Sequence, residues 1–328
     1  MRRALLPLVP LYAAAVGAKN LAYAQGWMRQ RWLKGPVISI GNLSVGGSGK
    51  TPLTIHLAQL LTKQRIEVDV LSRGYGRSSN RVRRVDPEGS ADDFGDEPLL
   101  IARAAGVPVY VGASRFAAGQ LAESESPAPR VHLLDDGLQH RRLGRAADII
   151  VLHRSDFSES LLPAGRLREP LSSIARAEIV VLREEDSDLL RRVRALGYRS
   201  TVWCVTRSLA VPAVRRVVAF CAIARPEEFF SGLRAAGVAL LATRFWRDHH
   251  RLTVADVASL IELQRQHQAE AFLTTEKDLI RLSPDQRRVL ESVAPLHAVP
   301  LTVRSYEDVG IVAEIRAILA SSARPPQG

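Results

Sequence analysis

The stretch ISIGNLSVGGSGKTP, residues 38–52, decides the fold of this chain. It begins with apolar and β-branched residues and then changes to glycine, serine and lysine, the order of a buried strand, a glycine-rich turn and a helix start. The usual phosphate-loop pattern, G-x-x-x-x-G-K-[ST], has a glycine where this chain has Ser44. We still predict a phosphate loop, because Ser44 would lie at the loop mouth and its backbone amide is kept. A glycine turn with a chance lysine is the alternative.

In a phosphate loop, backbone N–H groups face the phosphates and the helix N-terminus adds its positive dipole end. We expect the helix to begin at Lys50 or Thr51. Lys50 would reach the β- and γ-phosphates and so act in catalysis, and the Thr51 hydroxyl would bind Mg²⁺. The residues predicted to bind the nucleotide are Ser44, Val45, Gly46, Gly47, Ser48, Gly49, Lys50 and Thr51.

A phosphate loop also predicts an acid at the end of a neighbouring strand, where it can hold the metal. The run VHLLDD, residues 131–136, supplies Asp135 and Asp136. Two adjacent carboxylates at a strand end either bind metal or cap the next turn. Beside a phosphate loop we favour the metal, and which of the two binds it directly is left open. The nucleotide is predicted to be ATP rather than GTP, because residues 275–278, TEKD, do not match the guanine pattern [NT]-K-x-D.

Short apolar runs alternate with helical patterns along the chain, which predicts an α/β fold with a mostly parallel sheet wrapped by helices. A second alternating set follows residue 208. We therefore predict a basic, aromatic N-terminal segment at 1–35, a phosphate-loop core at 36–208 and a smaller α/β C-terminal lobe at 209–328, with a frayed tail SSARPPQG. Strands are expected at 37–42, 68–73, 107–112, 131–136, 148–153 and 178–183, and helices at 50–63, 97–105, 114–123 and 185–196.

The net charge of the chain indicates its class of partner, and its two cysteines indicate its redox compartment. The chain of 328 residues carries a net charge of +11, which favours an anionic partner, although only five of its 45 basic residues are lysine and arginine-rich composition is a competing explanation. A nucleic-acid-binding ATPase is disfavoured, because we find no recognition module and aromatic residues make up only 5%. Cys204 and Cys221 lie in apolar strand-like runs, so we expect buried thiols in a reducing compartment.

Residues 1–35 combine basic charge with leucine and tryptophan and contain no acid. About 15 residues separate Arg3 from Lys19, which is short for a membrane-spanning helix of ~20 apolar residues. We favour a helix that lies in the headgroup layer of an anionic membrane; a helix packed on the core and a cleaved signal peptide are the alternatives. The basic residues of the segment are Arg2, Arg3, Lys19, Arg29, Arg31 and Lys34.

A set of segments in a fixed order makes a family resemblance specific. They are SIGNLSVGGSGKTP, LSRGYGR, DFGDEP, LLDDGLQHRRL, LLPAGRLREP, AFCAIARPEEFF, RDHH and LTTEKD. Together, over roughly residues 10–285, the chain resembles the tetraacyldisaccharide 4′-kinase family, the lipid A 4′-kinases. The resemblance implies transfer of the ATP γ-phosphate to the 4′-hydroxyl of a tetraacyl disaccharide 1-phosphate, a lipid A precursor, giving lipid IVA.

The resemblance also implies a place in the cell and the main catalytic residues. The family is peripheral on the cytoplasmic face of the inner membrane of Gram-negative bacteria, so the expected partners are this lipid and an anionic membrane surface, with no nucleic acid; protein partners are unknown. Asp96, in DFGDEP, matches the aspartate that takes the hydroxyl proton, and His249, in RDHH, matches the histidine that pairs with it. A plain helix cap is the alternative for Asp96, and the sequence does not prove whether His249 or His250 faces the site.

Further site residues follow from the same comparison. Glu169 matches a carboxylate near the metal, and Arg168 beside it is expected to contact phosphate. The predicted acceptor contacts are Arg73, Tyr75, Gln139, His140 and Arg168. Arg166 is a cation in a motif that is otherwise small and apolar, and we assign it no function. The competing class is a phosphate-loop nucleotide hydrolase that drives assembly or metal delivery; the guanine motif or metal-binding tract that it predicts is not visible.

Overall fold

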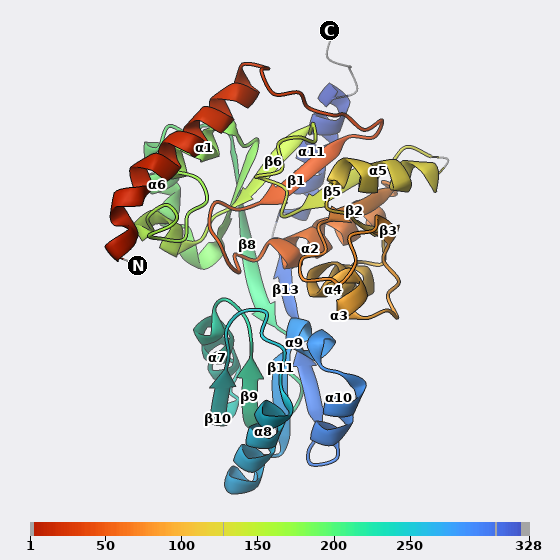
Figure 1. Cartoon of the computed structure of the whole chain (residues 1–328), viewed down its shortest axis with the longest axis vertical. Helices are drawn as coiled ribbons and strands as arrows, with labels where there is room; N and C mark the ends of the chain where they lie inside the picture. Colours follow the sequence, from red (N-terminus) through yellow and green to blue (C-terminus); the bar gives the residue numbers. More distant parts are fainter. Residues whose placement is uncertain (1–2, 127, 306, 323–328) are drawn as a thin grey trace.

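The structure is a computed structural model that describes residues 3–126, 128–305 and 307–322. It contains a larger body built on a nine-stranded sheet and a smaller lobe built on a four-stranded sheet (Figure 1). The fold class predicted from the sequence is therefore confirmed. Arg2 and most of the tail SSARPPQG, for which fraying was expected, lie outside the described residues.

The large sheet is mostly parallel. Among the described residues, two strand pairs are antiparallel: β13 (Leu301–Arg304) with β8 (Thr201–Leu209), and β3 (Arg83–Arg84) with β4 (Val109–Val111). β1 and β6 are buried along their whole length, as expected of near-continuous apolar strands covered on both faces. The strands in sheet order are β13 (Leu301–Arg304), β8 (Thr201–Leu209), β7 (Ile179–Arg183), β6 (Ala147–Val151), β1 (Val37–Gly41), β5 (Val131–Asp135), β2 (Val68–Ser72), β4 (Val109–Val111) and β3 (Arg83–Arg84).

Helices cover both faces of this sheet. Helix α2 (Lys50–Lys63) has the bounds expected from the sequence and places Leu53, Leu57 and Leu61 on one buried face, which packs in the same core cluster as Ile38 and Ile40 of β1. Helix α4 (Asp96–Ala105) packs on α2. Further helices between β3 and β8 are α3 (Ala91–Phe94), α4 (Asp96–Ala105), α5 (Arg115–Ser124) and α6 (Leu189–Ala195), with 3₁₀ segments η2 (Arg154–Ser158), η3 (Leu171–Arg176) and η4 (Glu184–Asp186).

The small lobe lies at the carboxyl end of β8, where the chain leaves the large sheet (Figure 1). Its sheet is parallel throughout, in the order β10 (Ala239–Phe245), β9 (Arg216–Cys221), β11 (Ala271–Thr275) and β12 (Leu296–Val299). Phe220, Phe230 and Phe272 are fully buried in its two clusters. The helices are α7 (Pro226–Ala235), α8 (Val254–His267), α9 (Glu276–Arg281) and α10 (Pro284–Glu291).

The end of the chain returns to the larger body. β13 pairs with β8, and α11 (Asp308–Ser322) contributes Ile311, Val312 and Ile315 to the core that contains β1 and α2. The sequence had placed all of 209–328 in the smaller lobe. The periodicity of the sequence does not predict this return, because β13 pairs with β8, about 95 positions earlier in the chain. We propose domain limits that assign residues 301–305 and 307–322 to the larger body.

Two local expectations were wrong. Cys204 is exposed, although Cys221 is buried as predicted. The reason is the period of two along β8: Trp203 and Val205 face the core, so Cys204 faces the other way. The N-terminal helix is also longer than the sequence suggested, since η1 (Arg3–Leu8) and α1 (Val9–Ala24) join into a helix that is long and apolar enough, by length and composition alone, to cross a membrane.

Candidate active site

The loop between β1 and α2, residues 42–49, lies at the carboxyl edge of the large sheet, where open α/β sheets bind ligands. Ser44 forms a bridge with Leu167, and the Val45 N–H donates to the Arg166 carbonyl at 2.8 Å. Ser44 is thus fixed by its backbone, which explains why a glycine is not required there. The helix begins at Lys50, one of the two starts that the sequence allowed.

The centre of this loop has the geometry of an anion cradle. In the described part of the chain, the N–H groups of residues 46–49 donate to no protein acceptor, and the buried Ser48 hydroxyl has no hydrogen-bond partner. Gly46 and Gly49 have φ angles of +107° and +92°, which side chains rarely adopt. Successive free N–H groups beside a helix N-terminus bind phosphate, so the residues present fit a nucleotide triphosphate.

Lys50 lies at the base of the cradle and is almost fully buried. Its Nζ donates to Asn42 Oδ1 at 2.8 Å and lies 3.3 Å from Asp136 Oδ1. A buried ammonium costs free energy unless it is paired, and these two partners compensate it. They also hold it at the carboxyl edge of β1, between the acids and the loop.

The two predicted acids have different environments. Asp135 is the last residue of β5, paired with Ile40 of β1, and accepts a hydrogen bond from Thr54 Oγ1 at 3.3 Å. Burial, with the charges of Glu97 and Asp136, raises the pKa of Asp135 to about 7. Burial also acts on Asp136, but Lys50 and Arg168 outweigh it and lower the pKa of Asp136 to about 2.

Thr51, Asp135 and Asp136 together suit a metal that is held jointly with a nucleotide. Within the described ranges, no three His, Cys, Asp or Glu side chains lie close enough to form a metal site of their own. Mg²⁺ commonly takes one or two carboxylates and completes its octahedron with phosphate oxygens and water. The donor set therefore fits Mg²⁺ with bound ATP.

Arg168, Gln139 and Glu169 form a second layer behind Asp136. Arg168 Nη1 lies 3.2 Å from Asp136 Oδ2 and donates to Gln139 Oε1 at 2.9 Å. Both Glu169 oxygens are bound by Arg176, at 2.6 and 2.9 Å. A metal would have to displace these bonds, so the role of Glu169 as a ligand stays a prediction.

The N-terminal helix contacts this second layer directly. The Tyr12 hydroxyl donates to the Arg168 carbonyl at 3.0 Å, and Asn20 Nδ2 donates to Glu169 Oε2 at 2.9 Å. Lys19 Nζ donates to the Gln139 carbonyl at 3.3 Å. The segment predicted to bind membranes is thus attached to the loop that supports the acid pair.

The predicted catalytic pair is present at the junction with the small lobe. Asp96 begins α4; its Oδ1 accepts the Glu97 N–H at 3.0 Å, and its Oδ2 lies 3.2 Å from His249 Nδ1. Arg281 of α9 also donates to Oδ2, through Nε at 2.9 Å. Although burial opposes it, His249 and Arg281 hold the pKa of Asp96 well below its usual range. The hydrogen bond to Asp96 raises the pKa of His249.

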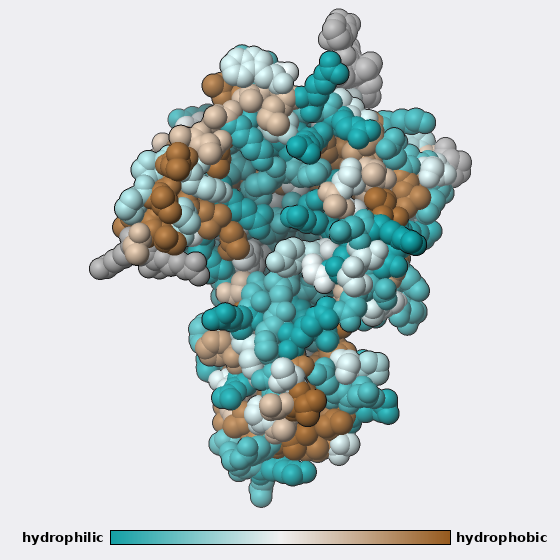
Figure 2. Space-filling model, in the orientation of Figure 1, coloured by the Kyte–Doolittle hydropathy of each residue, from teal (hydrophilic) through white to brown (hydrophobic). Residues whose placement is uncertain are grey.

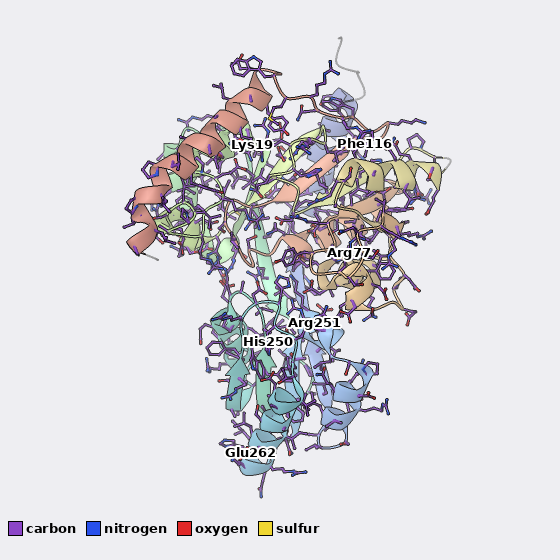
Figure 3. All side chains as sticks on the ribbon, viewed as in Figure 1. Lys19, Arg77, Phe116, His250, Arg251 and Glu262 are labelled. Atoms are coloured by element: carbon purple, nitrogen blue, oxygen red, sulfur yellow. The ribbon has the colours of Figure 1, made fainter. Side chains whose placement is uncertain are left out.

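The geometry also separates the two adjacent histidines. His249 has a φ of +64° and lies 5.5 Å from the Tyr75 ring, whereas His250 bonds to Asp256 at 2.9 Å and stacks on Trp246. Strained backbone of this kind is found at functional sites. Figure 3 marks Arg77 and Arg251 on opposite sides of the junction. The pocket at the pair is lined by Tyr75, Gly76, Ala91, Asp96, His249, Arg251 and Arg281.

The capping alternative for Asp96 accounts for only half of its contacts. Gly95, with a φ of +88°, is the residue that precedes the helix, and Asp96 Oδ1 accepts a first-turn N–H. Oδ2 instead contacts His249 and Arg281, which belong to the small lobe. One carboxylate therefore both starts α4 and anchors the junction.

Sequence reasoning missed Glu97 and its partner Lys277, which lie between the two clusters. Lys277 Nζ is 2.5 Å from Glu97 Oε1. Lys277, and more weakly Lys50, lower the pKa of Glu97, whose charge in turn raises that of Asp135. Glu97 lies in the quoted segment DFGDEP, directly after Asp96, and Lys277 lies in LTTEKD. Their position in these segments could have identified them from the sequence.

The remaining predicted acceptor contacts lie close to a buried arginine. Arg73 is exposed. Burial of Arg115 and, second, the positive charge of Arg73 lower the pKa of Arg115 to about 10. Burial and the Arg115 charge lower the pKa of His140 to about 4, so His140 is neutral at pH 7. Arg115 was not predicted, because it lies outside the quoted segments.

A phosphate cradle, an acid pair beside it and a carboxylate–imidazole pair across the junction define a phosphate-loop kinase. The chain matches the family model described as tetraacyldisaccharide-1-P 4′-kinase over residues 1–319. It belongs to that family.

Individual relatives agree with this assignment. A tetraacyldisaccharide 4′-kinase of Koribacter versatilis is 42% identical over 95% of this chain and 98% of that protein. One of Chromobacterium violaceum is 38% identical over 85% of this chain and 83% of its own. The crystal structure of LpxK from Aquifex aeolicus in complex with ATP matches with a TM-score of 0.76 and 31% identity, over 97% of this chain and 99% of the other.

Replacing Lys50 with alanine tests the cradle. The variant removes a positive charge from the site where negative charge spreads over the transferring phosphoryl group, so kcat/KM should fall by at least ~10²-fold. Steady-state kinetics measures the loss, with circular dichroism as the folding control. Near-normal turnover in a folded Lys50→Ala protein would contradict the assignment.

A double-mutant cycle tests the Asp96–His249 pair. If His249 acts through Asp96, the double alanine variant should be little slower than Asp96→Ala alone. The matched control is His250→Ala, which we expect to leave kcat nearly unchanged. Additive losses in the cycle would show separate roles, and a lowered melting temperature with normal kcat in Asp96→Ala would favour the helix cap.

Proposed function

We propose that this protein transfers the γ-phosphoryl group of ATP to the 4′-hydroxyl of a tetraacyl disaccharide 1-phosphate, giving lipid IVA. The observation that carries the proposal is the Asp96–His249 pair, which faces a pocket at the junction and is joined electrostatically to the phosphate cradle through Glu97. Family membership supplies the class of acceptor. In this proposal the cradle is the donor site and the pocket at Asp96 and His249 is the acceptor site.

The arrangement suits the electronic demands of phosphoryl transfer. The transition state is loose, with charge spread over the transferring oxygens, so positioning and electrostatics matter more than a strong base. Asp96 is ionised at neutral pH, since its pKa is depressed, and the remaining lone pair of Oδ1 can orient the hydroxyl and accept its proton as the bond forms. Lys50 supplies positive charge on the donor side.

Mg²⁺ would be held by Thr51 and the Asp135/Asp136 pair, and when bound it neutralises charge on the β- and γ-phosphate oxygens. Asp136 enters this site already ionised because Lys50 and Arg168 lower its pKa. Arg168 thus helps to keep Asp136 ionised. In our proposal Arg168 also contacts a phosphate group of the bound substrates.

The competing hydrolase that drives assembly or metal delivery would need no acceptor pocket. The test incubates the protein with ATP and Mg²⁺, with and without the tetraacyl disaccharide 1-phosphate, and measures ADP and phosphorylated lipid. We expect ADP formation that depends on the acceptor and matches lipid product one to one. ADP formation at the same rate without acceptor would overturn the kinase proposal.

We further propose that the protein is peripheral on the cytoplasmic face of the inner membrane of a Gram-negative bacterium. Apolar residues are visible on the surface along α1 (Figure 2). The exposed large apolar side chains of this region are Leu6, Leu8, Leu11, Leu21, Trp27 and Trp32. Each Lys or Arg near an anionic surface adds about 1 kcal/mol of binding free energy.

Substitutions in the N-terminal helix formed by η1 and α1 separate membrane binding from support of the site. Leu8→Gln and Leu11→Gln together should weaken binding to anionic vesicles and raise KM for the long-chain acceptor, with ATP affinity nearly unchanged. Asn20→Ala should leave vesicle binding intact and lower kcat, because it removes the hydrogen bond from α1 to Glu169, which then keeps only its bonds to Arg176 and Gln139. Vesicle co-sedimentation and kinetics measure both. Unchanged sedimentation of the double variant would show that α1 is only a packed helix.

A further inference from the structure

Two arginines lie against the outer side of the phosphate loop and have no role in the site described so far. Arg166 Nε donates to the Val45 carbonyl at 3.1 Å. Its guanidinium lies so close to Gly46 that a Cβ there would be 2.2 Å from Nη2. The cation that interrupts LLPAGRLREP is therefore packed on the loop itself.

Arg225 reaches the same loop from the small lobe, where it stands between β9 and α7. Its Nε donates to the Gly47 carbonyl at 2.7 Å. The rest of the guanidinium is fixed by the larger body, since Nη2 donates to Ser155 Oγ at 3.1 Å and Nη1 lies 2.6 Å from His153 Nδ1. Arg225 therefore bridges the two parts of the molecule at the loop.

These two bonds fix the direction in which the loop's N–H groups point. A trans peptide is planar, and its carbonyl oxygen and the following N–H point to opposite sides. When the arginines hold the carbonyls of Val45 and Gly47, the N–H groups of Gly46 and Ser48 point away from the guanidiniums. Both N–H groups belong to the set that has no protein acceptor in the described residues.

A charged cluster holds Arg225 in place and leaves positive charge at the loop. Glu228, in the first turn of α7, binds His153 at 2.8 Å, Arg183 at 2.8 Å and Arg207 at 3.3 Å. Burial opposes ionisation, but these partners lower the pKa of Glu228 to about 2. Glu228 thus faces several cations, with Glu185 as a second partner of Arg183 at 3.0 Å, and the Arg207 guanidinium lies near Gly49, 3.9 Å from where a Cβ would be.

We propose that Arg166 and Arg225 are positioning residues for the nucleotide: they hold the phosphate loop in its phosphate-binding conformation, and Arg225 makes the small lobe part of the ATP site. The inference rests on the proposed function only in naming ATP as the nucleotide. It adds that loop geometry depends on the small lobe, which contributes no residue to the loop sequence.

The test measures binding of a non-hydrolysable ATP analogue to Arg166→Gln, Arg225→Gln and Arg225→Lys by calorimetry, without acceptor. A charge-assisted hydrogen bond supports a rise in Kd of about tenfold for each glutamine variant. Arg225→Lys keeps the charge but lacks the Nε donor, so its Kd should stay raised. In kinetics, KM for ATP should rise more than kcat falls.

Two controls keep the outcomes distinct. Arg288→Gln removes an exposed arginine of α10 and should bind the analogue like the natural protein. Glu228→Gln loosens the cluster but does not change either arginine that contacts the loop. We expect it to lower the melting temperature and to raise the Kd for the analogue less than Arg225→Gln does. Unchanged Kd in both glutamine variants overturns the proposal, and full recovery in Arg225→Lys reduces it to simple charge attraction. Failure of the proposed function would appear instead as normal analogue binding without acceptor phosphorylation.

Discussion

Compensation of buried negative charge is the constraint on which the rest of this structure depends. Four carboxylates, those of Asp96, Glu97, Asp135 and Asp136, come together at the carboxyl edge of the large sheet and the start of α4. Uncompensated charges in such a place would cost several kcal/mol each. Three of the acids pair with cations, whereas the charges of Lys50 and Lys277 do not outweigh the burial of Asp135, whose pKa is raised. The cations are Lys50 and Arg168 on Asp136, Lys277 on Glu97 and Arg281 on Asp96.

The origin of these cations explains the architecture. Lys50 comes from the phosphate loop and Arg168 from a loop of the larger body, but Lys277 and Arg281 lie on α9 of the small lobe. The small lobe therefore lies over the carboxyl edge of the large sheet. The chain enters the lobe from β8 and returns to the sheet through β13. His249 arrives at Asp96 by the same placement. The contacts that hold the lobe are thus the contacts that complete the site.

The sequence predicted what local pattern encodes. The strand, glycine-rich turn and helix around Lys50 follow from adjacent residues, and α2 was found with its bounds. Pairings between distant segments were not predictable in this way: Arg281 meets Asp96 across 185 positions, and Asn20 meets Glu169 across 149. The return of β13 to β8 also joins distant segments, whereas the exposure of Cys204 depends on which face of β8 meets the core.

The central claim is that the phosphate loop and the acid pair form one metal–nucleotide centre that neither completes alone. Electron paramagnetic resonance of Mn²⁺, a substitute for Mg²⁺, tests it directly in titrations with and without a non-hydrolysable ATP analogue. The account predicts tight Mn²⁺ binding only with the analogue, and its loss in Asp135→Asn combined with Asp136→Asn. Equally tight Mn²⁺ binding without nucleotide, or binding that survives both substitutions, would contradict it.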